Sequence, residues 1–463
     1  MRRTDRESIG PRDVEGPRLF GTDGIRGKAG TPPLDAGTVR RIGAALVRAL
    51  PRGQASEPAR LLVGRDTRES GTWIEAELAH GAGGEGARVT SAGVVPTPAI
   101  AYLTRSAGYD AGVVISASHN PFEDNGIKVF SGAGEKFTEA LERQVEAVMA
   151  DSSWTAPQAP AEVPAVDYCE EYERHLGQIL PERLRRRGMR IAVDCANGAT
   201  TTVAPQIFEH LGFDATFLGV EPDGRNINLQ CGSTHPQGLA EVVVGGGFEM
   251  GIAFDGDGDR AIFVDASGAI VDGDAVMLMC AKGLKAEGRL KGDAVVATVM
   301  SNIGLEIALR AAGIAIVRCP VGDKHVMEEM LKRGLSLGGE QSGHVIFADY
   351  LFTGDGLATA LSVLRVMAAS GRALANLASE MTAYPQVLMN LRVKEKVDLS
   401  SVPAVAAVLQ SVESRLEGSG RLLVRYSGTE PLLRVMLEGQ NQGEIRRWGQ
   451  EIIDAVRQHV GAA

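Results

Sequence analysis

Short runs of apolar and β-branched residues alternate with amphipathic stretches along most of the chain. The runs at residues 113–115, 190–193, 251–254 and 294–297 have the composition of buried strands. The spacing of apolar residues elsewhere predicts helices over residues 138–149, 169–179 and 353–367. Strands that alternate with helices build parallel sheets with helices on both faces. The alternation therefore predicts an α/β fold made of several consecutive units.

With 463 residues, the chain is too long for one ordinary domain. A stretch rich in Pro, Ala and Ser at residues 151–164 is typical of a linker. Strand patterns at residues 387–393, 422–425 and 433–437 indicate a smaller α+β module at the end of the chain. We therefore predict a polar tail and four domains, with the ranges 1–16, 17–165, 166–268, 269–382 and 383–463.

The formal net charge of −10 argues against nucleic acid or an anionic membrane as the main partner. A phosphate ligand would need a local positive pocket in this negative protein. No stretch approaches the roughly 20 apolar residues of a membrane span, and the polar N-terminus lacks the apolar region of a secretory signal. The five cysteines are scattered without C-x-x-C spacing, which predicts reduced thiols in a cytoplasmic protein.

The most specific motif is DGDGDR at residues 255–260, in which Asp255, Asp257 and Asp259 precede Arg260. Alternate residues of an extended chain point the same way, so the three carboxylates converge and would repel one another. A hard divalent cation that prefers oxygen ligands, such as Mg²⁺, relieves this repulsion. The run lacks the Gly and Glu of an EF-hand loop at its sixth and twelfth positions. The alternative is a solvated acidic turn, although the run directly follows an apolar strand.

A serine loop follows another strand and contains Ser118 and His119, within ISASHNPFEDNGIK at residues 115–128. Ligands of open α/β sheets bind at the carboxyl ends of strands, where this turn would lie. A serine beside a histidine, with Lys128 ten residues later, is typical of an activated nucleophile. A polar turn that caps a helix is the alternative that this segment alone leaves open.

Two further loops carry groups that suit sugars and phosphates. Glu340, Ser342 and His344 alternate in sequence, which predicts that an acid, a hydroxyl and an imidazole share one face. The segment RYSGTEP at residues 425–431, with Arg434 beyond it, offers guanidinium groups, hydroxyls and an accessible backbone N–H to a phosphate. The alternatives are a glycine-rich turn for the first loop and a hairpin with surface arginines for the second.

Two other glycine-rich segments carry weaker signals. Residues 20–27 place Arg26 in a glycine-rich loop, for which an ordinary loop is the favoured interpretation. Residues 81–86 match G-x-G-x-x-G, but they follow a helical pattern and precede a strand, whereas a dinucleotide site needs the reverse order. We therefore interpret residues 81–86 as a loop that ends a helix.

Taken in order, these motifs resemble the signatures of the α-D-phosphohexomutase superfamily over nearly the whole chain. Within it, the segments most similar to those of bacterial phosphoglucosamine mutases are GTDGIRG (21–27), SASHNPFEDNGIK (116–128), NINLQCGSTHP (226–236), GEQSGH (339–344) and RYSGTEP (425–431). The resemblance implies three related domains with mixed α/β sheets and a smaller C-terminal α+β domain, arranged around a central cleft.

The resemblance also implies roles for individual residues. Ser118 would carry the phosphoryl group, and Asp255, Asp257 and Asp259 would bind Mg²⁺ together with a phosphate oxygen on Ser118. Lys128 and Arg26 would assist acid–base chemistry or the transition state. The residues implied in substrate binding are His119, Arg260, Lys324, His325, Glu340, Ser342, His344, Arg425, Ser427, Gly428, Thr429 and Arg434. The loop at residues 321–325 departs from the V-G-D-R-Y pattern of relatives, which bears on hexose preference.

The implied reaction interconverts glucosamine 6-phosphate and glucosamine 1-phosphate, upstream of UDP-N-acetylglucosamine and peptidoglycan. It would use a phosphoserine enzyme, Mg²⁺ and a hexose 1,6-bisphosphate as priming activator. The expected partners are sugar phosphates, with no nucleic acid or membrane, and relatives are often homodimers. The remaining alternatives are a phosphomannomutase/phosphoglucomutase with the same mechanism, a metal-dependent phosphatase and a non-catalytic sugar-phosphate sensor.

Overall fold

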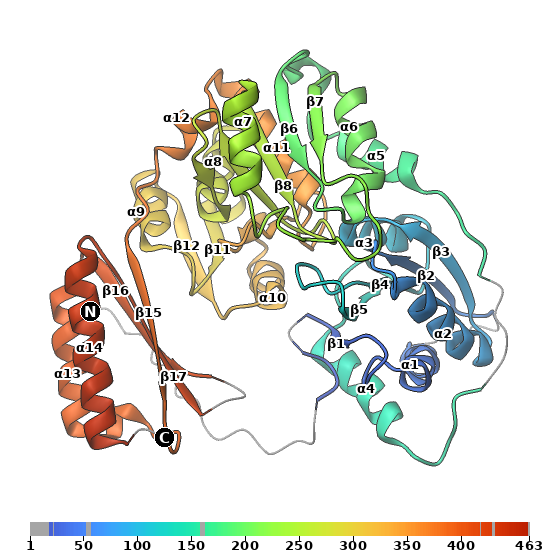
Figure 1. Cartoon of the computed structure of the whole chain (residues 1–463), viewed down its shortest axis with the longest axis horizontal. Coiled ribbons are helices and arrows are strands. Elements are labelled where there is room, and N and C mark those ends of the chain that lie inside the picture. Colours follow the sequence, from blue (N-terminus) through green and yellow to red (C-terminus); the bar gives the residue numbers. More distant parts are fainter. Residues whose placement is uncertain are drawn as a thin grey trace.

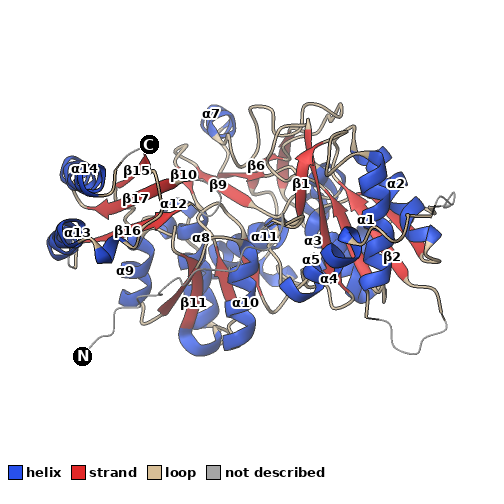
Figure 2. Ribbon diagram, turned by 90° about the horizontal axis from the view of Figure 1, so that it is seen from below, coloured by secondary structure: helices blue, strands red, loops and turns tan. Residues whose placement is uncertain are grey.

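The computed structural model describes residues 18–21, 23–51, 57–157, 163–416, 418–427 and 431–461. The polar tail expected at residues 1–16 lies outside these ranges. Four β-sheets follow one another along the described chain, and each is the centre of one domain (Figure 1). Helices flank the sheets (Figure 2), so the predicted α/β class is confirmed. None of the described helices is both long and apolar enough to span a bilayer.

Domain 1 has a five-stranded sheet with the order β1-β5-β4-β2-β3. β2 runs parallel to β3 and β4, whereas β5 runs antiparallel to β4 and β1. The elements are β1 (Ile25–Lys28), α1 (Ala36–Ala49), β2 (Arg60–Arg65), α2 (Gly71–Gly84), β3 (Arg88–Val94), α3 (Thr97–Ser106), β4 (Ala111–Ile115), β5 (Asp124–Ser131) and α4 (Glu139–Ala150). Every residue of β4 is buried, as its apolar run predicts.

Domain 2 has the strand order β10-β9-β8-β6-β7, in which β6 is parallel to β7 and β8 while β9 is antiparallel to β8 and β10. Its helices and strands are α5 (Cys169–Gly177), β6 (Arg190–Asp194), α6 (Ala204–His210), β7 (Asp214–Leu218), α7 (Gln237–Gly246), β8 (Met250–Phe254), β9 (Ala261–Asp265) and β10 (Ile270–Val271), with short 3₁₀ turns at Glu182–Leu184 and Ala199–Thr202. The sheet continues past residue 268 because the turn after β9 leads into β10 of the same sheet.

Domain 3 has a four-stranded sheet with the order β12-β11-β13-β14, and only β14 is antiparallel to its neighbour. Its elements are α8 (Gly273–Ala286), β11 (Ala294–Thr298), α9 (Ile303–Ala311), β12 (Ala315–Cys319), α10 (Asp323–Arg333), β13 (Leu337–Gly339), β14 (Val345–Phe347), α11 (Gly356–Ser370) and α12 (Leu374–Ala378), with a 3₁₀ turn at Lys291–Asp293. α11 begins later than the predicted residue 353 because Asp355 caps it, accepting a hydrogen bond from the backbone N–H of Ala358.

Domain 4 has a smaller antiparallel sheet with the order β15-β17-β16. Its elements are β15 (Gln386–Arg392), a 3₁₀ turn (Leu399–Ser401), α13 (Pro403–Leu416), β16 (Gly420–Tyr426), β17 (Leu432–Gly439) and α14 (Gln442–His459). The two helices pack beside the sheet at the left end of the molecule, opposite domain 1 (Figure 1). This module has the α+β character that the terminal strand pattern predicts.

One apolar cluster spans domains 1 to 3 in addition to clusters within each of them, whereas the cluster of domain 4 is confined to that domain. One cluster of buried side chains includes Ile100 of domain 1, Phe254 of domain 2 and Leu361 of domain 3. A separate cluster includes Val435 and Ile452 of domain 4. Burial of apolar surface is the main stabilising term in a fold. The first three domains are therefore held together by shared packing that does not include domain 4.

Two local predictions need correction. The sheets are mixed, as the resemblance implies, and not parallel, as the alternation of strands and helices alone predicts, because a short connection turns the chain back into an antiparallel strand in each of the first three domains. The segment 81–86 is not a loop throughout, since α2 continues to Gly84. Gly81 lies inside this helix, where a Cβ would be 1.8 Å from the carbonyl oxygen of Arg40 in α1. A glycine at position 81 therefore lets α1 and α2 pack closely. The helix α2 precedes the strand β3, which is the reverse of the order that a dinucleotide site needs.

Candidate active site

Each of the four motif loops joins a strand to an antiparallel neighbour. The serine loop joins β4 to β5, the aspartate loop joins β8 to β9, and the Glu340 loop joins β13 to β14. In domain 4, Arg425 and Arg434 flank the connection between β16 and β17. The loops of the first three domains come together around Ser118, Asp255 and Asp259 through the contacts that follow.

Ser118 sits on a buried and strained turn. Its φ of +51° is in the left-handed region, which costs a residue other than glycine about 1–2 kcal/mol. Its N–H donates to Ser116 Oγ at 2.9 Å, and its hydroxyl donates to Asp255 Oδ2 in domain 2. Its carbonyl oxygen accepts from Arg68 at 3.1 Å and from Asn228 Nδ2 at 2.9 Å. The conformation is therefore held by contacts from two domains, and it directs the hydroxyl at the aspartate loop.

Asp255, Asp257 and Asp259 form a buried acidic cluster whose carboxylate oxygens lie within 4.8 Å of one another. Burial, together with the charges of Asp259 and Asp257, raises the pKa of Asp255 well above its ordinary value. The Oδ1 atoms of Asp257 and Asp259 are buried and have no hydrogen-bond partner among the described residues. Buried carboxylate oxygens without partners are costly, and a hard divalent cation would satisfy them. This donor set fits Mg²⁺.

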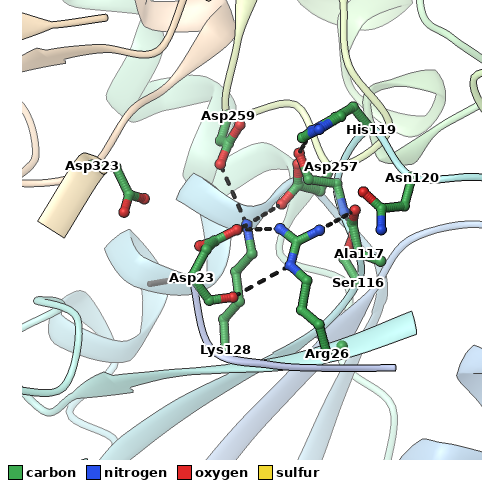
Figure 3. A network of polar contacts seen from close by, with 12 residues as sticks. Asp23, Arg26, Ser116, Ala117, His119, Asn120, Lys128, Asp257, Asp259 and Asp323 are labelled. Atoms are coloured by element: carbon green, nitrogen blue, oxygen red, sulfur yellow. Dashed lines mark hydrogen bonds and ion pairs between the residues drawn. The ribbon is translucent and has the colours of Figure 1, made fainter. Parts of the chain in front are cut away.

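Lys128, on β5, extends into the acidic cluster (Figure 3). Its Nζ lies 2.9 Å from Asp257 Oδ2, 3.4 Å from Asp259 Oδ2 and 3.0 Å from Asp23 Oδ2. Burial alone would lower the pKa of Lys128, but these three carboxylates raise it well above its ordinary value. Lys128 is therefore a fixed cation and not a ready proton acceptor.

Arg26, on β1, pairs with the same oxygen of Asp23 that Lys128 contacts (Figure 3). It also donates to the carbonyl oxygen of Ala117, the residue before the serine. Despite burial, Lys128, Lys136 and Arg26 hold the pKa of Asp23 well below its ordinary value. The predicted pair Lys128 and Arg26 is thus brought together by an aspartate that the sequence analysis did not single out.

His119 and Arg260 face each other across the same loops. Arg260 donates to His119 Nδ1 at 3.2 Å, and this ring nitrogen lies 3.4 Å from Ser118 Oγ. Burial and the positive charges of Arg260 and Arg26 lower the pKa of His119 to about 4. The imidazole is therefore neutral near pH 7, and Arg260 supplies the positive charge beside the serine hydroxyl.

Glu340, Ser342 and His344 lie on a hairpin turn instead of an extended segment. The N–H of Gly343 donates to the Glu340 carbonyl at 3.1 Å, so the side chains do not share one face as predicted. Ser342 is exposed, whereas His344 is buried. The Nε2 of His344 accepts from the N–H of Gly354 at 3.1 Å, which places the ring proton on Nδ1, 3.5 Å from Asp259 Oδ2. His344 thus touches the aspartate loop.

Lys324 and His325 lie in the first turn of α10. Lys324 Nζ pairs with Glu142 of domain 1 at 2.7 Å, and His325 lies 3.6 Å from Glu328 of its own helix. Lys324 therefore links domain 3 to domain 1 in this arrangement. The roles of both residues in sugar binding stay predictions.

Arg425 and Arg434 are register partners on β16 and β17. Burial and the charge of Arg434 lower the pKa of Arg425, and Arg434 Nε is buried without a hydrogen-bond partner among the described residues. Two facing guanidinium groups suit an anion. Ser427 is buried beside them, while Gly428 and Thr429 lie outside the described residues. Domain 4 is at the opposite end of the molecule from domain 1 (Figure 1), so these arginines stand apart from Ser118.

Sequence reasoning missed several residues that hold the site. Arg68 is buried, pairs with Asp66, and donates to the carbonyl oxygens of Ser118 and Asn120. Asn228 of domain 2 donates to the same two oxygens. A signal existed for Asn228, which lies inside the NINLQCGSTHP segment quoted for the resemblance, but nothing local tells what its side chain touches.

The chain matches family models along most of its length. Models of the phosphoglucomutase/phosphomannomutase α/β/α domains I, II and III match residues 17–156, 167–268 and 272–384, and the model of the C-terminal domain matches residues 388–455. The chain therefore belongs to the phosphoglucomutase/phosphomannomutase family of α-D-phosphohexomutases and is an isomerase.

A bacterial relative and two solved structures agree with this membership. The phosphoglucosamine mutase of Solibacter usitatus is 49% identical over 96% of this chain and 99% of its own. A phosphoglucomutase/phosphomannomutase family protein from Burkholderia thailandensis has 25% identity and a TM-score of 0.78, covering 96% of this chain and 98% of its own. The Aspergillus fumigatus N-acetylphosphoglucosamine mutase, solved with GlcNAc-6P and magnesium, has the same fold, with 18% identity and a TM-score of 0.61 over 96% of both chains.

Proposed function

We propose that this protein interconverts glucosamine 6-phosphate and glucosamine 1-phosphate through a phosphoserine at Ser118 and a 1,6-bisphosphate intermediate. The observation that carries the proposal is the hydrogen bond from the Ser118 hydroxyl to Asp255, which belongs to the buried acidic cluster. The choice of the glucosamine esters rests on the likeness to the Solibacter usitatus enzyme. In a bacterium, the product would lead to UDP-N-acetylglucosamine and peptidoglycan.

Asp255, Asp257 and Asp259 would hold Mg²⁺ together with an oxygen of the phosphoryl group on Ser118. The Oδ1 atoms of Asp257 and Asp259, which have no hydrogen-bond partner among the described residues, support this assignment. When bound, the ion supplies positive charge to the oxygens of the phosphoryl group during transfer. Lys128 would supply a second positive charge from the other side of the carboxylates, since its own pKa is raised well above the ordinary value.

The first transfer breaks the bond between phosphorus and Ser118 Oγ and forms a bond to the free hydroxyl of the sugar phosphate. The proton of the attacking hydroxyl leaves, and Ser118 Oγ gains one. After the bisphosphate reorients, its other phosphoryl group returns to Ser118. Such transfers depend mainly on positioning and on electrostatic stabilisation. Arg26 and Arg260, both fixed near the serine loop, would contribute positive charge.

The other end of the substrate would bind in domain 4 and on the Glu340 loop. Arg425 and Arg434 would grip the phosphate that does not react, together with Ser427, Gly428 and Thr429. Glu340 and Ser342 would contact sugar hydroxyls, helped by His344, Lys324 and His325. This separation lets one phosphate site accept the sugar in two orientations while chemistry stays at Ser118. Arg425→Ala should therefore raise KM and also lower kcat, because the arginine would help to close the site against water.

The test incubates purified protein with Mg²⁺, a trace of glucose 1,6-bisphosphate and, separately, the 6-phosphates of glucosamine, glucose and mannose. We expect the parent to prefer the glucosamine ester and to show a mass increase of one phosphoryl group on Ser118. Ser118→Ala should show neither conversion nor the mass increase. Preference for glucose or mannose 6-phosphate would overturn the sugar assignment, and release of inorganic phosphate at the rate of conversion would favour a phosphatase. Ordinary mutase activity in Ser118→Ala would overturn the phosphoserine mechanism.

A further inference from the structure

Alternating charges form a continuous path through three domains beside the site. In order, the path contains Asp257 of domain 2, Lys128, Asp23 and Lys136 of domain 1, and Asp323 of domain 3, and we call it the charge chain. Lys128 Nζ lies 2.9 Å from Asp257 Oδ2 and 3.0 Å from Asp23 Oδ2. Lys136 Nζ lies 2.7 Å from Asp23 Oδ1 and also pairs with Asp323 Oδ2.

Asp23 divides its two oxygens between two lysines. One oxygen contacts Lys128 and also pairs with Arg26, whereas the other contacts Lys136, so a turn of the carboxylate away from this arrangement separates Oδ1 from Lys136. Lys136 follows β5, the strand that carries Lys128, and its side chain is 10% exposed. Burial alone would lower the pKa of Lys136, but Asp23 and Asp323 raise it above its ordinary value, which keeps it charged.

Asp323 connects the charge chain to the domain 3 loop at residues 321–325, which is predicted to bear on hexose preference. It is the first residue of α10, the helix whose next two residues are Lys324 and His325. Its carboxylate also lies 3.8 Å from His344 Nε2. Figure 3 shows Asp323 to one side of Asp23 and Lys128. Lys136 pairs with both Asp23 and Asp323 and so connects the two. Domain 3 therefore reaches Asp23, the partner of Lys128, through the ion pair between Lys136 and Asp323.

We propose that Lys136 and Asp323 are positioning residues for phosphoryl transfer. They act through Asp23 on Lys128, so docking of domain 3 against domain 1 fixes the Asp23 side of the ammonium group, whose other contacts are Asp257 and Asp259 of domain 2. A buried ion pair that loses one partner leaves an uncompensated charge, and the remaining side chains then rearrange. Without Lys136, Asp23 Oδ1 would lose its lysine partner, and the carboxylate would shift toward Arg26 and Lys128 on its other oxygen, which displaces Lys128 from its present position. The inference rests on the proposed phosphoserine function.

The first experiment compares Lys136→Met with the parent protein in two assays. One assay is the rate at which Ser118 takes a phosphoryl group from glucose 1,6-bisphosphate, followed by intact mass. The other is kcat and KM with the sugar phosphate that the parent prefers. A displacement of about 1 Å in a catalytic group costs on the order of 100-fold in rate. We expect losses of this size in uptake and kcat, little change in KM, and substantial recovery in Lys136→Arg, which keeps the charge.

The second experiment tests coupling with Asp323→Asn and with the double variant that combines Lys136→Met and Asp323→Asn. The single variant Asp323→Asn also tests the inference if Lys136→Met does not fold. If both residues act through one path, the double variant loses little more than the worse single variant. Thr202→Val is a matched control, because it removes another interdomain hydrogen bond, from Thr202 Oγ1 to the Val94 carbonyl at 3.1 Å, away from the charge chain.

Three results would overturn the inference: uptake and kcat within about threefold of the parent in Lys136→Met, multiplicative losses in the double variant, or an equal loss in Thr202→Val. Failure of the proposed function looks different, since the parent itself would then convert no hexose phosphate. If such a parent still takes up a phosphoryl group, the uptake assay alone decides on the charge chain. If it does not, the proposed function and the inference both fall.

Discussion

Replacing Asn228 by alanine probes how the strained serine loop is held. Asn228 Nδ2 donates to the Ser118 carbonyl at 2.9 Å and to the Asn120 carbonyl at 3.3 Å. The residue is 7% exposed, so water does not readily replace these bonds. Asn228 belongs to domain 2 and the loop belongs to domain 1. The substitution therefore removes an interdomain contact at the backbone of the proposed nucleophile.

The magnitude follows from the contacts that remain. Leaving a buried carbonyl without its donor costs about 1–3 kcal/mol. Arg68 still donates to the same two oxygens, at 3.1 Å from the Ser118 carbonyl and 2.5 Å from the Asn120 carbonyl, which keeps the loss near the lower end. If about 1–2 kcal/mol of positioning is lost in the transition state, kcat/KM falls by a factor of roughly 5 to 30.

The assay is kcat/KM with the preferred sugar phosphate, alongside the phosphorylated fraction of Ser118 by intact mass. Asn228→Asp keeps the size of the side chain but places a carboxylate against two carbonyl oxygens, so its loss should exceed that of alanine. Asn226→Ala is a control in the same segment, since the Asn226 side chain bonds only to nearby exposed backbone. Activity of Asn228→Ala within twofold of the parent, or an aspartate variant no worse than alanine, would refute the reasoning.

Three further predictions concern space, metal and pH. Gly256→Ala should inactivate the enzyme, because a Cβ would lie 2.6 Å from the Ser118 carbonyl oxygen, whereas Gly245→Ala, in open space on α7, should keep full activity. Mg²⁺ should raise the Tm of the parent in a thermal melt, and it should raise that of Asp257→Asn less, since a ligand stabilises the state that binds it. Burial and the charge of Asp272 raise the pKa of Asp274 to about 7, so the folded state holds this proton more tightly than the unfolded chain. The stability from Asp274 is full below the unfolded pKa of roughly 3.9 and is lost as pH rises through about 7. The Tm of Asp274→Asn relative to the parent should therefore increase from pH 5 to pH 8, and a constant difference would contradict the assignment.

Strand positions were predictable because burial leaves a local signal. The apolar runs at residues 113–115 and 251–254 fall within β4 and β8, all of whose residues are buried. Strand direction was predicted correctly by the resemblance, which implied mixed sheets, and wrongly by the alternation of strands and helices, which predicted parallel sheets. β8 ends at Phe254 and β9 begins at Ala261, and so short a connection does not allow the crossover of a dozen or more residues that parallel neighbours need. The loop lengths therefore already indicated mixed sheets.

The candidate site was predictable where chemistry is concentrated in one segment. The aspartates at 255, 257 and 259 are close in sequence, and the structure places them in one buried cluster. The supporting residues are pairs that only the tertiary fold creates. Lys136 and Asp323 are separated by 187 positions, and Asn228 and Ser118 by 110. The loop at residues 321–325, which contains Asp323, was singled out only for hexose preference, and Lys136 lies in none of the quoted motifs, so no local pattern could have paired them.

The distribution of the core suggests why the proposed chemistry and the proposed phosphate grip lie on different bodies. The serine, aspartate and Glu340 loops belong to three domains that share one apolar cluster, so their relative positions are costly to change. Arg425 and Arg434 belong to a domain with a separate core. Domain 4 is joined to domain 3 by hydrogen bonds, such as those between the Asn302 side chain and the Tyr384 backbone. A rotation of domain 4 would therefore break polar contacts such as that between Arg421 and the Ser301 carbonyl oxygen, but it would not divide an apolar cluster. A bisphosphate that must turn over between two transfers needs such a division, in which the reacting centre stays fixed while the phosphate grip opens and closes.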